Sequence, residues 1–495
     1  MRLAIVLPKV DVASAGTRIR YARLQAAFED LGHTLTLNTL DDLIADPALT
    51  DDAYLISKIR DVRSVVLAHR LRAAGKHVGI DIFDDYYSHV DDSRFVHVRT
   101  WFDQIAPLLT FALTSTARME MRLERLLPGL PRHRLNDPFT PWDHDSVAKR
   151  CAAAAQEARH SRTLRVLWFG IGNNPHFSVG LSDLCNYGHV LRELERAPWR
   201  VELTVLTNRR ALTADILTRL ARIGVATRIE IWSEAREAEL LGATTLAFLP
   251  VNAQRFSTTK SLNRAVTALT AGAQVLSVGF PLYADLDPFL YRDGDAFLAD
   301  LEADRLRLRE ATLPGRDAAL AECGKASTEA AALATFFAAL PEPAPLADGP
   351  FAVVFGRGVK PDVVAAVARG GGLTVATSLA PGKLAYDVRV RDKDVVLSAA
   401  AAAALRPILS DAPRLLDDNS GRSTLALTAL GLPVLRRIPA TGPHAFALYR
   451  AEVTRVRAVL AELFEPSTTF ILSEQKSPFW AGKTGLDDLH LKGAA

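Results

Sequence analysis

Short apolar runs alternate with longer, more polar segments along the first 340 residues, and this alternation constrains the fold more than any other feature. The first run, LAIVLP at residues 3–8, is followed by a segment of helix length. Runs of this length are typical of buried parallel strands. Further runs of the same kind lie at residues 34–38, 53–60, 77–82, 164–172, 201–208, 227–233, 244–251 and 274–279. The alternation predicts an α/β protein with doubly wound parallel sheets.

The apolar runs and the proline-rich stretches together divide the chain into three expected domains. Residues 1–145 form a first Rossmann-like domain that ends in LNDPFTPWDHD. Residues 160–340 restart the same pattern of strands and helices and form a second Rossmann-like domain. The stretch PEPAPLADGP at 341–350 is typical of a linker because of its proline content. Residues 350–495 are then expected to form a third, smaller Rossmann-like α/β domain.

Three stretches of the expected third domain repeat stretches of the second domain in the same order. They are residues 351–358 with 164–172, 373–377 with 203–207, and 419–435 with 260–276. The order favours a degenerate, shortened copy of the second domain. The alternative is that all α/β sheets share patterns of this kind.

Composition excludes several classes of function. The 495 residues carry a formal net charge of only +3, which gives no support for a nucleic-acid partner. The three cysteines lie far apart, so neither a disulfide framework nor a zinc site is expected. No run approaches the roughly 20 apolar residues of a membrane span, and the first residues do not resemble a signal peptide. We therefore expect a soluble, cytoplasmic protein, with peripheral contact at the inner face of a membrane left open.

The stretch STTKSLNR opens a predicted helix and places two cations, Lys260 and Arg264, in its first turn. A helix dipole disfavours cations there, so a bound anion would explain both of them. Free backbone amides at a helix start add to such a phosphate site. Thr259 and Ser261 can cap the helix or donate to a phosphate oxygen. The alternative is a pair of solvated cations beside a capping serine.

A glycine-containing loop follows the first strand of the second domain. Gly170 and Gly172 end the run at 164–172, and Asn173 comes next. A glycine lets the backbone approach a ligand closely and adopt conformations that other residues avoid. The loop is therefore a candidate for contact with phosphates. The alternative is that these glycines serve the geometry of the turn alone.

The densest cluster of carboxylates in the first domain follows a predicted strand. Asp81, Asp84 and Asp85 lie within IDIFDDYYSH. A carboxylate there can act as a base or hold a metal ion, but an aspartate at the end of a strand is also common as a helix cap or turn former. Tyr86 and Tyr87, which come next, can stack on the face of a sugar.

The stretch KSLNRAVTALTAGAQVLSVGFPLYADL at 260–286 resembles GT-B glycosyltransferases of the family 1/4 type. Shared features are a Lys-Ser-x-Asn-Arg helix start, an Ala-Leu-x-x-Gly turn, an apolar strand and Pro-x-Tyr. GTRIR at 16–20 and GKHVGIDIFDD at 75–85 add to the resemblance, which covers residues 1–340 in layout. It implies two Rossmann-like domains in the GT-B arrangement, with a nucleotide-diphosphate sugar between them. The implied reaction is transfer of the sugar to a glycan, lipid-linked or protein acceptor.

The resemblance also implies roles for individual residues. The catalytic residues implied are Lys260, Arg264 and Asp84. The donor-binding residues implied are Gly170, Gly172, Asn173, Thr259, Lys260, Ser261, Asn263 and Arg264. The acceptor-binding residues implied are Gly16, Arg18, Asp85 and Tyr86. No metal ion is expected at the donor phosphates and no cofactor besides the nucleotide sugar, because the helix dipole and the basic residues take that role in the family.

One departure from the family pattern leaves other functions open. Retaining enzymes of this type often carry two glutamates across the helix start, but residues 256–272 contain none. The sequence therefore does not decide between a retaining and an inverting reaction. A non-catalytic glycan-binding or assembly subunit stays open as an alternative. So does a sugar-nucleotide epimerase of the same fold, which would need carboxylates and a histidine around the sugar.

Overall fold

We analysed a computed structural model of the chain. The structure describes residues 1–346 except 13, 47, 90–92 and 345, and then residues 351–355, 360–370, 373–376, 383–390, 395–397 and 469–473.

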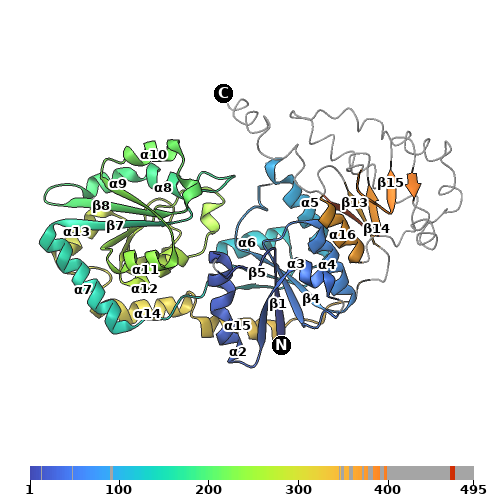
Figure 1. Ribbon diagram of the computed structural model, residues 1–495. Helices are drawn as coiled ribbons and strands as arrows, with labels where there is room; N and C mark the ends of the chain where they lie inside the picture. Colours follow the sequence, from blue (N-terminus) through green and yellow to red (C-terminus); the bar gives the residue numbers. More distant parts are fainter. Residues whose placement is uncertain are drawn as a thin grey trace.

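The first domain is built on a parallel sheet of six strands (Figure 1). The strands are β1 Arg2–Leu7, β2 Thr34–Thr39, β3 Ala53–Ser57, β4 His77–Ile82, β5 Phe111–Thr114 and β6 Arg132–Arg134. Their order across the sheet is β2-β1-β3-β4-β5-β6. The chain therefore reverses its direction of progress between β1 and β3, and open α/β sheets bind ligands at such a switch point, outside the carboxyl ends of the strands.

Helices cover both faces of this sheet. They are α1 Ala15–Thr17, α2 Arg23–Glu29, α3 Leu40–Ala45, α4 Val62–Ala73, α5 Val96–Ile105 and α6 Ala117–Leu126, with a π-helical turn at Arg18–Ala22 and short 3-10 turns at Ser93–Phe95 and Ala106–Leu108. The helices α3, α4 and α5 pack in one hydrophobic core, and α2 packs in another core on the opposite face. Residues 3–7 of β1 are buried between the two cores, which explains why this strand is apolar throughout.

The second domain has its own parallel sheet of six strands. The strands are β7 Thr163–Gly170, β8 Arg200–Thr207, β9 Ala226–Ile231, β10 Leu246–Phe248, β11 Gln274–Leu276 and β12 Leu290–Tyr291. Their order, β12-β11-β10-β7-β8-β9, is that of a dinucleotide-binding Rossmann sheet. Here the switch point lies between β7 and β10, so the loops after these two strands are the expected ligand-binding loops.

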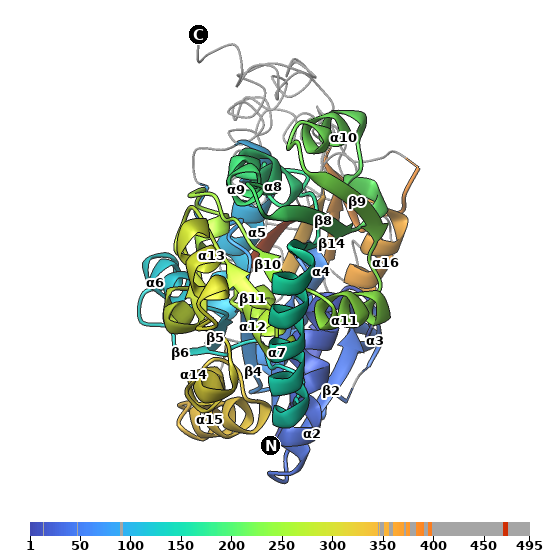
Figure 2. The ribbon, with the colours of Figure 1, turned by 90° about the vertical axis from the view of Figure 1, so that its left-hand side faces the viewer.

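The helices of the second domain also form two layers. They are α7 His144–Ser161, α8 Leu181–Asn186, α9 Gly188–Leu194, α10 Ala214–Ala221, α11 Glu234–Gly242, α12 Asn263–Ala271, α13 Gly294–Glu302 and α14 Leu313–Glu322. Short 3-10 turns lie at η4 Arg209–Ala211, η5 Ser257–Thr259, η6 Ala284–Phe289 and η7 Glu310–Thr312. One core contains residues of α8, α9 and α13, and the other contains residues of α11, α12 and α14. The helix α7 runs across the outer side of the domain and contributes to both cores (Figure 2).

The last helix before the linker, α15 Ala326–Ala338, packs against the first domain and not the second. Its side chains share a core with α2, and the two helices lie side by side in Figure 1. The chain therefore crosses between the domains twice. The crossings are held together by a hydrogen bond from Phe139 N to Gly324 O of 3.1 Å. Gly324 has a φ of +133°, and a Cβ there would lie 2.5 Å from Asp137 O, so only glycine fits.

A third sheet is described in part. Its strands are β13 Phe351–Phe355, β14 Leu373–Ala376, β15 Val388–Val390, β16 Val395–Leu397 and β17 Thr469–Ser473, in the order β16-β15-β14-β13-β17. Only the pair β15 and β16 is antiparallel. The helix α16 Pro361–Arg369 packs against α3 and α4 of the first domain. The sequence repeat at 419–435 lies outside the described residues.

These observations confirm the predicted α/β class and the two Rossmann-like domains. The domain boundaries, and the prediction that residues 350–495 form a degenerate copy of the second domain, stay predictions.

Candidate active site

The two domains meet through the carboxyl ends of their strands. The polar contacts that join them include the pairing of Lys260 with Asp84, the approach of Arg18 Nε to a Glu234 oxygen at 3.2 Å, and a hydrogen bond of 3.1 Å from Asn174 Nδ2 to the Tyr86 hydroxyl. Every one of these residues follows a strand or lies in the next turn or helix. The ligand-binding edges of both sheets therefore face each other.

The helix α12 begins later than the sequence predicts. Residues Ser257–Thr259 form a separate 3-10 turn, and α12 starts at Asn263 with Leu262 in the N-cap position. No side chain caps this helix, so the prediction that Thr259 or Ser261 caps it is wrong. Thr259 is fully buried, and its hydroxyl donates to Phe256 O at 3.3 Å. The first-turn amides of α12 are consequently left for a ligand or for water.

Arg264 lies in that first turn and is half-buried. Its side chain packs against Gly170 at the end of β7, where a Cβ would lie 3.4 Å from Arg264 Cδ. Gly170 has a φ of +142°, a conformation that favours glycine. In the part of the chain that the structure describes, Arg264 forms no ion pair and no side-chain hydrogen bond. The second domain thus presents an unneutralised cation at its switch point, beside free amides and a glycine.

The rest of the loop after β7 is arranged by packing and by one asparagine. Gly172 is buried, and a Cβ there would lie 2.5 Å from Thr207 Oγ1, so this glycine is required for packing. Asn208 accepts from Gly172 N at 2.8 Å and donates to Asn173 Oδ1 at 3.1 Å. Asn208 follows the strand VELTVLT directly. This place at the carboxyl end of β8 is the sequence signal that could have identified Asn208 as a candidate site residue.

Asp183 stabilises the other side of the same loop through hydrogen bonds. It is 5% exposed, accepts from Gly180 N at 3.1 Å and also accepts from Asn252, which follows β10. Burial raises the pKa of Asp183, although these hydrogen bonds and the nearby charge of Arg264 oppose the shift. Asp183 therefore ties together the two loops that flank the switch point.

Lys260 is not free in this structure. Its ammonium group pairs with Asp84 across the interface and lies 4.0 Å from the centre of the Phe256 ring. The side chains of both ion-pair partners are partly exposed, at 36% and 26%. Ser261 and Asn263 are half-buried beside it. The structure thus brings together the three predicted catalytic residues, since Asp84 meets Lys260 and Arg264 lies one turn further along.

Two predicted acceptor-binding residues are occupied by other contacts. Asp85 is 1% exposed, and its oxygens accept from Ser88 and from Arg122 of α6. It is therefore a structural residue here and is not available to an acceptor. Arg122 in turn donates to Thr258 Oγ1 at 2.9 Å, which joins α6 to the second domain. Arg18 pairs with Glu234 and its guanidinium lies 5.4 Å from the centre of a second-domain tryptophan ring.

The other two predicted acceptor-binding residues, Gly16 and Tyr86, border a small pocket. Its volume is about 160 Å³, and it is lined by Lys58, Arg60, Asp81, Ile82, Phe83, Asp84, Tyr86 and Tyr87. Gly16 lies against Lys58, because a Cβ at Gly16 would be 2.1 Å from Lys58 Nζ. Lys58 and Arg60 were not among the site residues predicted from the sequence, although they come within three residues of the end of the strand AYLIS.

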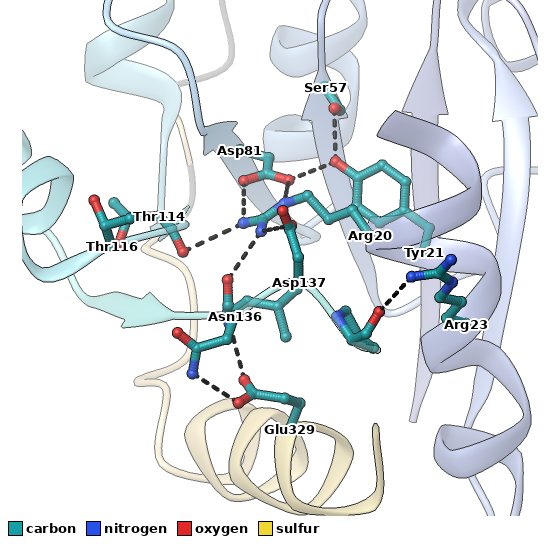
Figure 3. A network of polar contacts seen from close by, with 12 residues as sticks. Arg20, Tyr21, Arg23, Ser57, Asp81, Thr114, Thr116, Asn136, Asp137 and Glu329 are labelled. Carbon is teal, nitrogen blue, oxygen red and sulfur yellow. Dashed lines mark hydrogen bonds and ion pairs between the residues drawn. The ribbon is translucent and has the colours of Figure 1, made fainter. Parts of the chain in front are cut away.

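A buried polar network supports the first-domain side of the interface (Figure 3). Arg20, 2% exposed, forms a bidentate ion pair with Asp81 and also donates to Leu135 O at 2.9 Å. The Tyr21 hydroxyl donates to Asp81 and lies 2.6 Å from Ser57 Oγ, whose own hydroxyl donates to the tyrosine oxygen. Burial alone would lower the pKa of Arg20. The charge of Asp81 and its hydrogen bonds to Arg20 act in the opposite direction, and the pKa of Arg20 is raised. The negative charge of Asp81, which lies three residues before Asp84, is thereby neutralised.

The network continues to the crossings between the domains. Arg20 Nη1 also lies 3.2 Å from Asp137 Oδ1. Asn136 donates through its backbone amide and its side chain to Glu329 of α15, at 2.9 and 2.7 Å. Glu329 is 4% exposed, and burial raises its pKa, although Asn136 opposes the shift. The segment that leaves the first domain is therefore anchored to both the sheet and α15.

The described residues contain neither a candidate membrane-spanning helix nor a candidate metal site. No described helix has the length and apolar character needed to cross a membrane. The described residues also contain no group of three or more His, Cys, Asp or Glu side chains that could hold a metal ion.

Comparison with known proteins gives similarities in structure alone. No family model and no curated protein matches the chain. Among solved structures, HepE of Anabaena in complex with UDP is 10% identical with a TM-score of 0.47, over 69% of this chain and 100% of that one. A UDP-forming α,α-trehalose-phosphate synthase from Burkholderia vietnamiensis is 14% identical with a TM-score of 0.44, over 68% and 96%. A glycosyltransferase from Rickettsia africae is 10% identical with a TM-score of 0.40, over 68% and 94%.

At such identities and TM-scores, these similarities carry no argument about the function of this chain. The assignment to the family 1/4 type stays a prediction. The Rickettsia protein is named as a glycosyltransferase and the Burkholderia protein as a trehalose-phosphate synthase.

Proposed function

We propose that the chain is a glycosyltransferase of the GT-B type that transfers a sugar from a nucleotide-diphosphate sugar to a hydroxyl group of an acceptor. The observation that carries this proposal is Arg264. This half-buried cation at the start of α12 packs on Gly170 at the switch point of the second sheet and has no ion-pair partner among the described residues. A cation and free amides at this place suit a diphosphate.

In the proposed reaction, the bond between the sugar C1 and the diphosphate oxygen breaks and a bond from C1 to the acceptor oxygen forms. The diphosphate leaves with the electron pair, and the acceptor hydroxyl loses its proton. Arg264 and the amides of α12 stabilise the charge that develops on the leaving group. Electrostatic stabilisation of the leaving group is stronger where water is excluded. The two facing domains favour the exclusion of water from the site.

Asp84 is the proposed acceptor of that proton. It follows β4 on the first-domain side and contacts Lys260, which is four residues before Arg264. A carboxylate in this position lies next to the leaving group and faces an acceptor bound to the first domain. Lys260 holds Asp84 in the absence of substrate, and it turns to the diphosphate when the donor binds. The acceptor is a glycan, a lipid-linked sugar or a protein.

We also propose that the reaction does not need a metal ion, because the helix start and Arg264 supply positive charge at the diphosphate. Excess chelator should then leave both nucleotide binding and sugar transfer unchanged. Loss of activity with chelator, restored by Mg²⁺ or Mn²⁺, would contradict this part of the proposal.

The decisive experiment measures nucleotide binding by calorimetry with a panel of nucleoside diphosphates. UDP, which is present in one of the similar structures, is the first ligand to test. Saturable binding supports a donor site. The absence of binding for the whole panel would refute the proposal and favour a non-catalytic glycan-binding or assembly subunit. A nucleotide sugar that is isomerised without any acceptor would instead indicate an epimerase.

A further inference from the structure

We propose that the pocket behind Asp84 binds an acidic group of the acceptor, so that the acceptor carries a phosphate or a carboxylate. This inference rests on the proposed function, since it concerns the acceptor of the same reaction. It follows from the charges around the pocket of about 160 Å³ on the first domain.

The lining of the pocket is balanced in formal charge, but its cations have no ion-pair partner among the described residues. It contains two cations, Lys58 and Arg60, and two carboxylates, Asp81 and Asp84. Both carboxylates have other partners, because Asp81 pairs with Arg20 and Asp84 pairs with Lys260. Both carboxylates lie near enough to Lys58 for their charges to favour its protonated form. Neither forms an ion pair with Lys58 or Arg60 in the part of the chain that the structure describes.

Arg60 has a hydrogen-bond donor without a partner. Its guanidinium lies over Tyr86 at 4.2 Å and near Tyr87 at 5.6 Å from the ring centres, which keeps it in place. Its Nε is buried, and within the described residues it donates no hydrogen bond. A buried donor that is left unpaired costs free energy, and a bound anion would remove that cost.

Lys58 is held in an unusual backbone conformation. Its φ is +61°, which is rare for residues other than glycine and is often found at functional sites. The ammonium group of Lys58 lies against Gly16, where a Cβ would require the lysine side chain to move. Gly16 follows β1 and Lys58 follows β3, so these residues flank the switch point of the first sheet. Ligands of open α/β sheets bind at this place.

The size and position of the pocket indicate what it holds. It is smaller than the roughly 300 Å³ at which pockets for whole small molecules begin, so it fits one acidic group and not a complete sugar. Asp84, the proposed base, forms part of its wall. An acceptor anchored here by a phosphate or carboxylate would therefore present a neighbouring hydroxyl group to Asp84.

The test uses the full chain with the substitution Arg264→Gln, which prevents anions from using the donor side. Thermal unfolding is followed over a series of inorganic phosphate concentrations, with chloride at the same ionic strength as the reference. Acetate in a parallel series separates a phosphate-binding pocket from a carboxylate-binding one. The apparent dissociation constant comes from the dependence of stability on concentration.

Two further substitutions identify the site. Lys58→Asn removes the charge and keeps a residue that tolerates positive φ, and Arg60→Gln removes the second cation. Each should weaken binding of the preferred anion about tenfold or more. Lys76→Met, at the opposite end of the sheet just before β4, is the matched control and should bind the anion as before.

The outcomes separate this inference from the proposed function. Saturable binding that both substitutions weaken supports the acidic acceptor. Equal effects of the anion on all variants, or no saturable effect at all, would overturn it, whether or not the unsubstituted chain binds UDP. Failure of the unsubstituted chain to bind any nucleoside diphosphate would refute the proposed function through a different measurement.

Discussion

Replacing Arg264 by glutamine tests the proposed donor site most directly. The substitution removes one charge and keeps a side chain of similar length that can still pack on Gly170. Hydrogen bonds to a charged group contribute about 1.5–3 kcal/mol. Loss of the contact to a diphosphate should therefore weaken UDP binding about ten- to a hundredfold.

The stability of the folded chain should change little. Arg264 has no ion pair to lose in the part of the chain that the structure describes, and substitutions of this kind stay within about 0.5 kcal/mol. Calorimetry measures the UDP affinity, and urea unfolding without ligand measures the stability. Arg165→Gln is the matched control, since Arg165 belongs to the same domain, is half exposed and, among the described residues, pairs with Glu157 alone. This control should bind UDP as the unsubstituted chain does.

Two results would refute the reasoning. Unchanged UDP affinity in Arg264→Gln would show that this arginine does not contact the diphosphate. A loss of several kcal/mol of stability would show that the side chain has a structural role that its contacts do not reveal.

Three other substitutions test the surroundings of the site. Gly170→Ala should cost about 1–3 kcal/mol of stability because of the φ of +142°; a variant as stable as the original chain in urea would contradict this. Asp81→Asn should cost about 3 kcal/mol or more in the same assay, because Arg20 stays buried without its main counter-charge; a neutral effect would show that the pair is not needed. Burial raises the pKa of Glu329, so its protonated form is favoured in the folded chain, and its contribution to stability declines as the pH rises from the ordinary value of 4.5 through the raised pKa. Glu329→Gln should therefore gain stability relative to the original chain over that pH range in thermal unfolding, and a constant difference between the two chains would contradict the raised pKa.

The two sheets could be predicted from the sequence because their central strands, such as β1 and β7, are largely apolar. LAIVLP and LRVLWFGIG became β1 and β7 for this reason. The strand order could not be predicted, since it depends on which crossover helix packs on which face. The apolar residues of α15 are typical of a packed helix, but nothing in them shows that it returns to the first domain.

The candidate site was predictable in position and less so in detail. The stretch around Lys260 and Arg264 lies at the switch point, as its motif suggests. The start of α12 differs because Leu262, which has no capping side chain, precedes it. The pairing of Lys260 with Asp84, and the burial of Asp85, depend on contacts between residues far apart in sequence, and local patterns do not record them.

The return of α15 to the first domain affects the order in which the chain can fold as it is made. Leu333 and Phe337 complete the core that contains Leu24 and Phe28 of α2. A ribosome synthesises these two residues only after the entire second domain. Until then, one side of α2 lacks its apolar cover, so the amino-terminal domain, although translated first, is finished only after its successor.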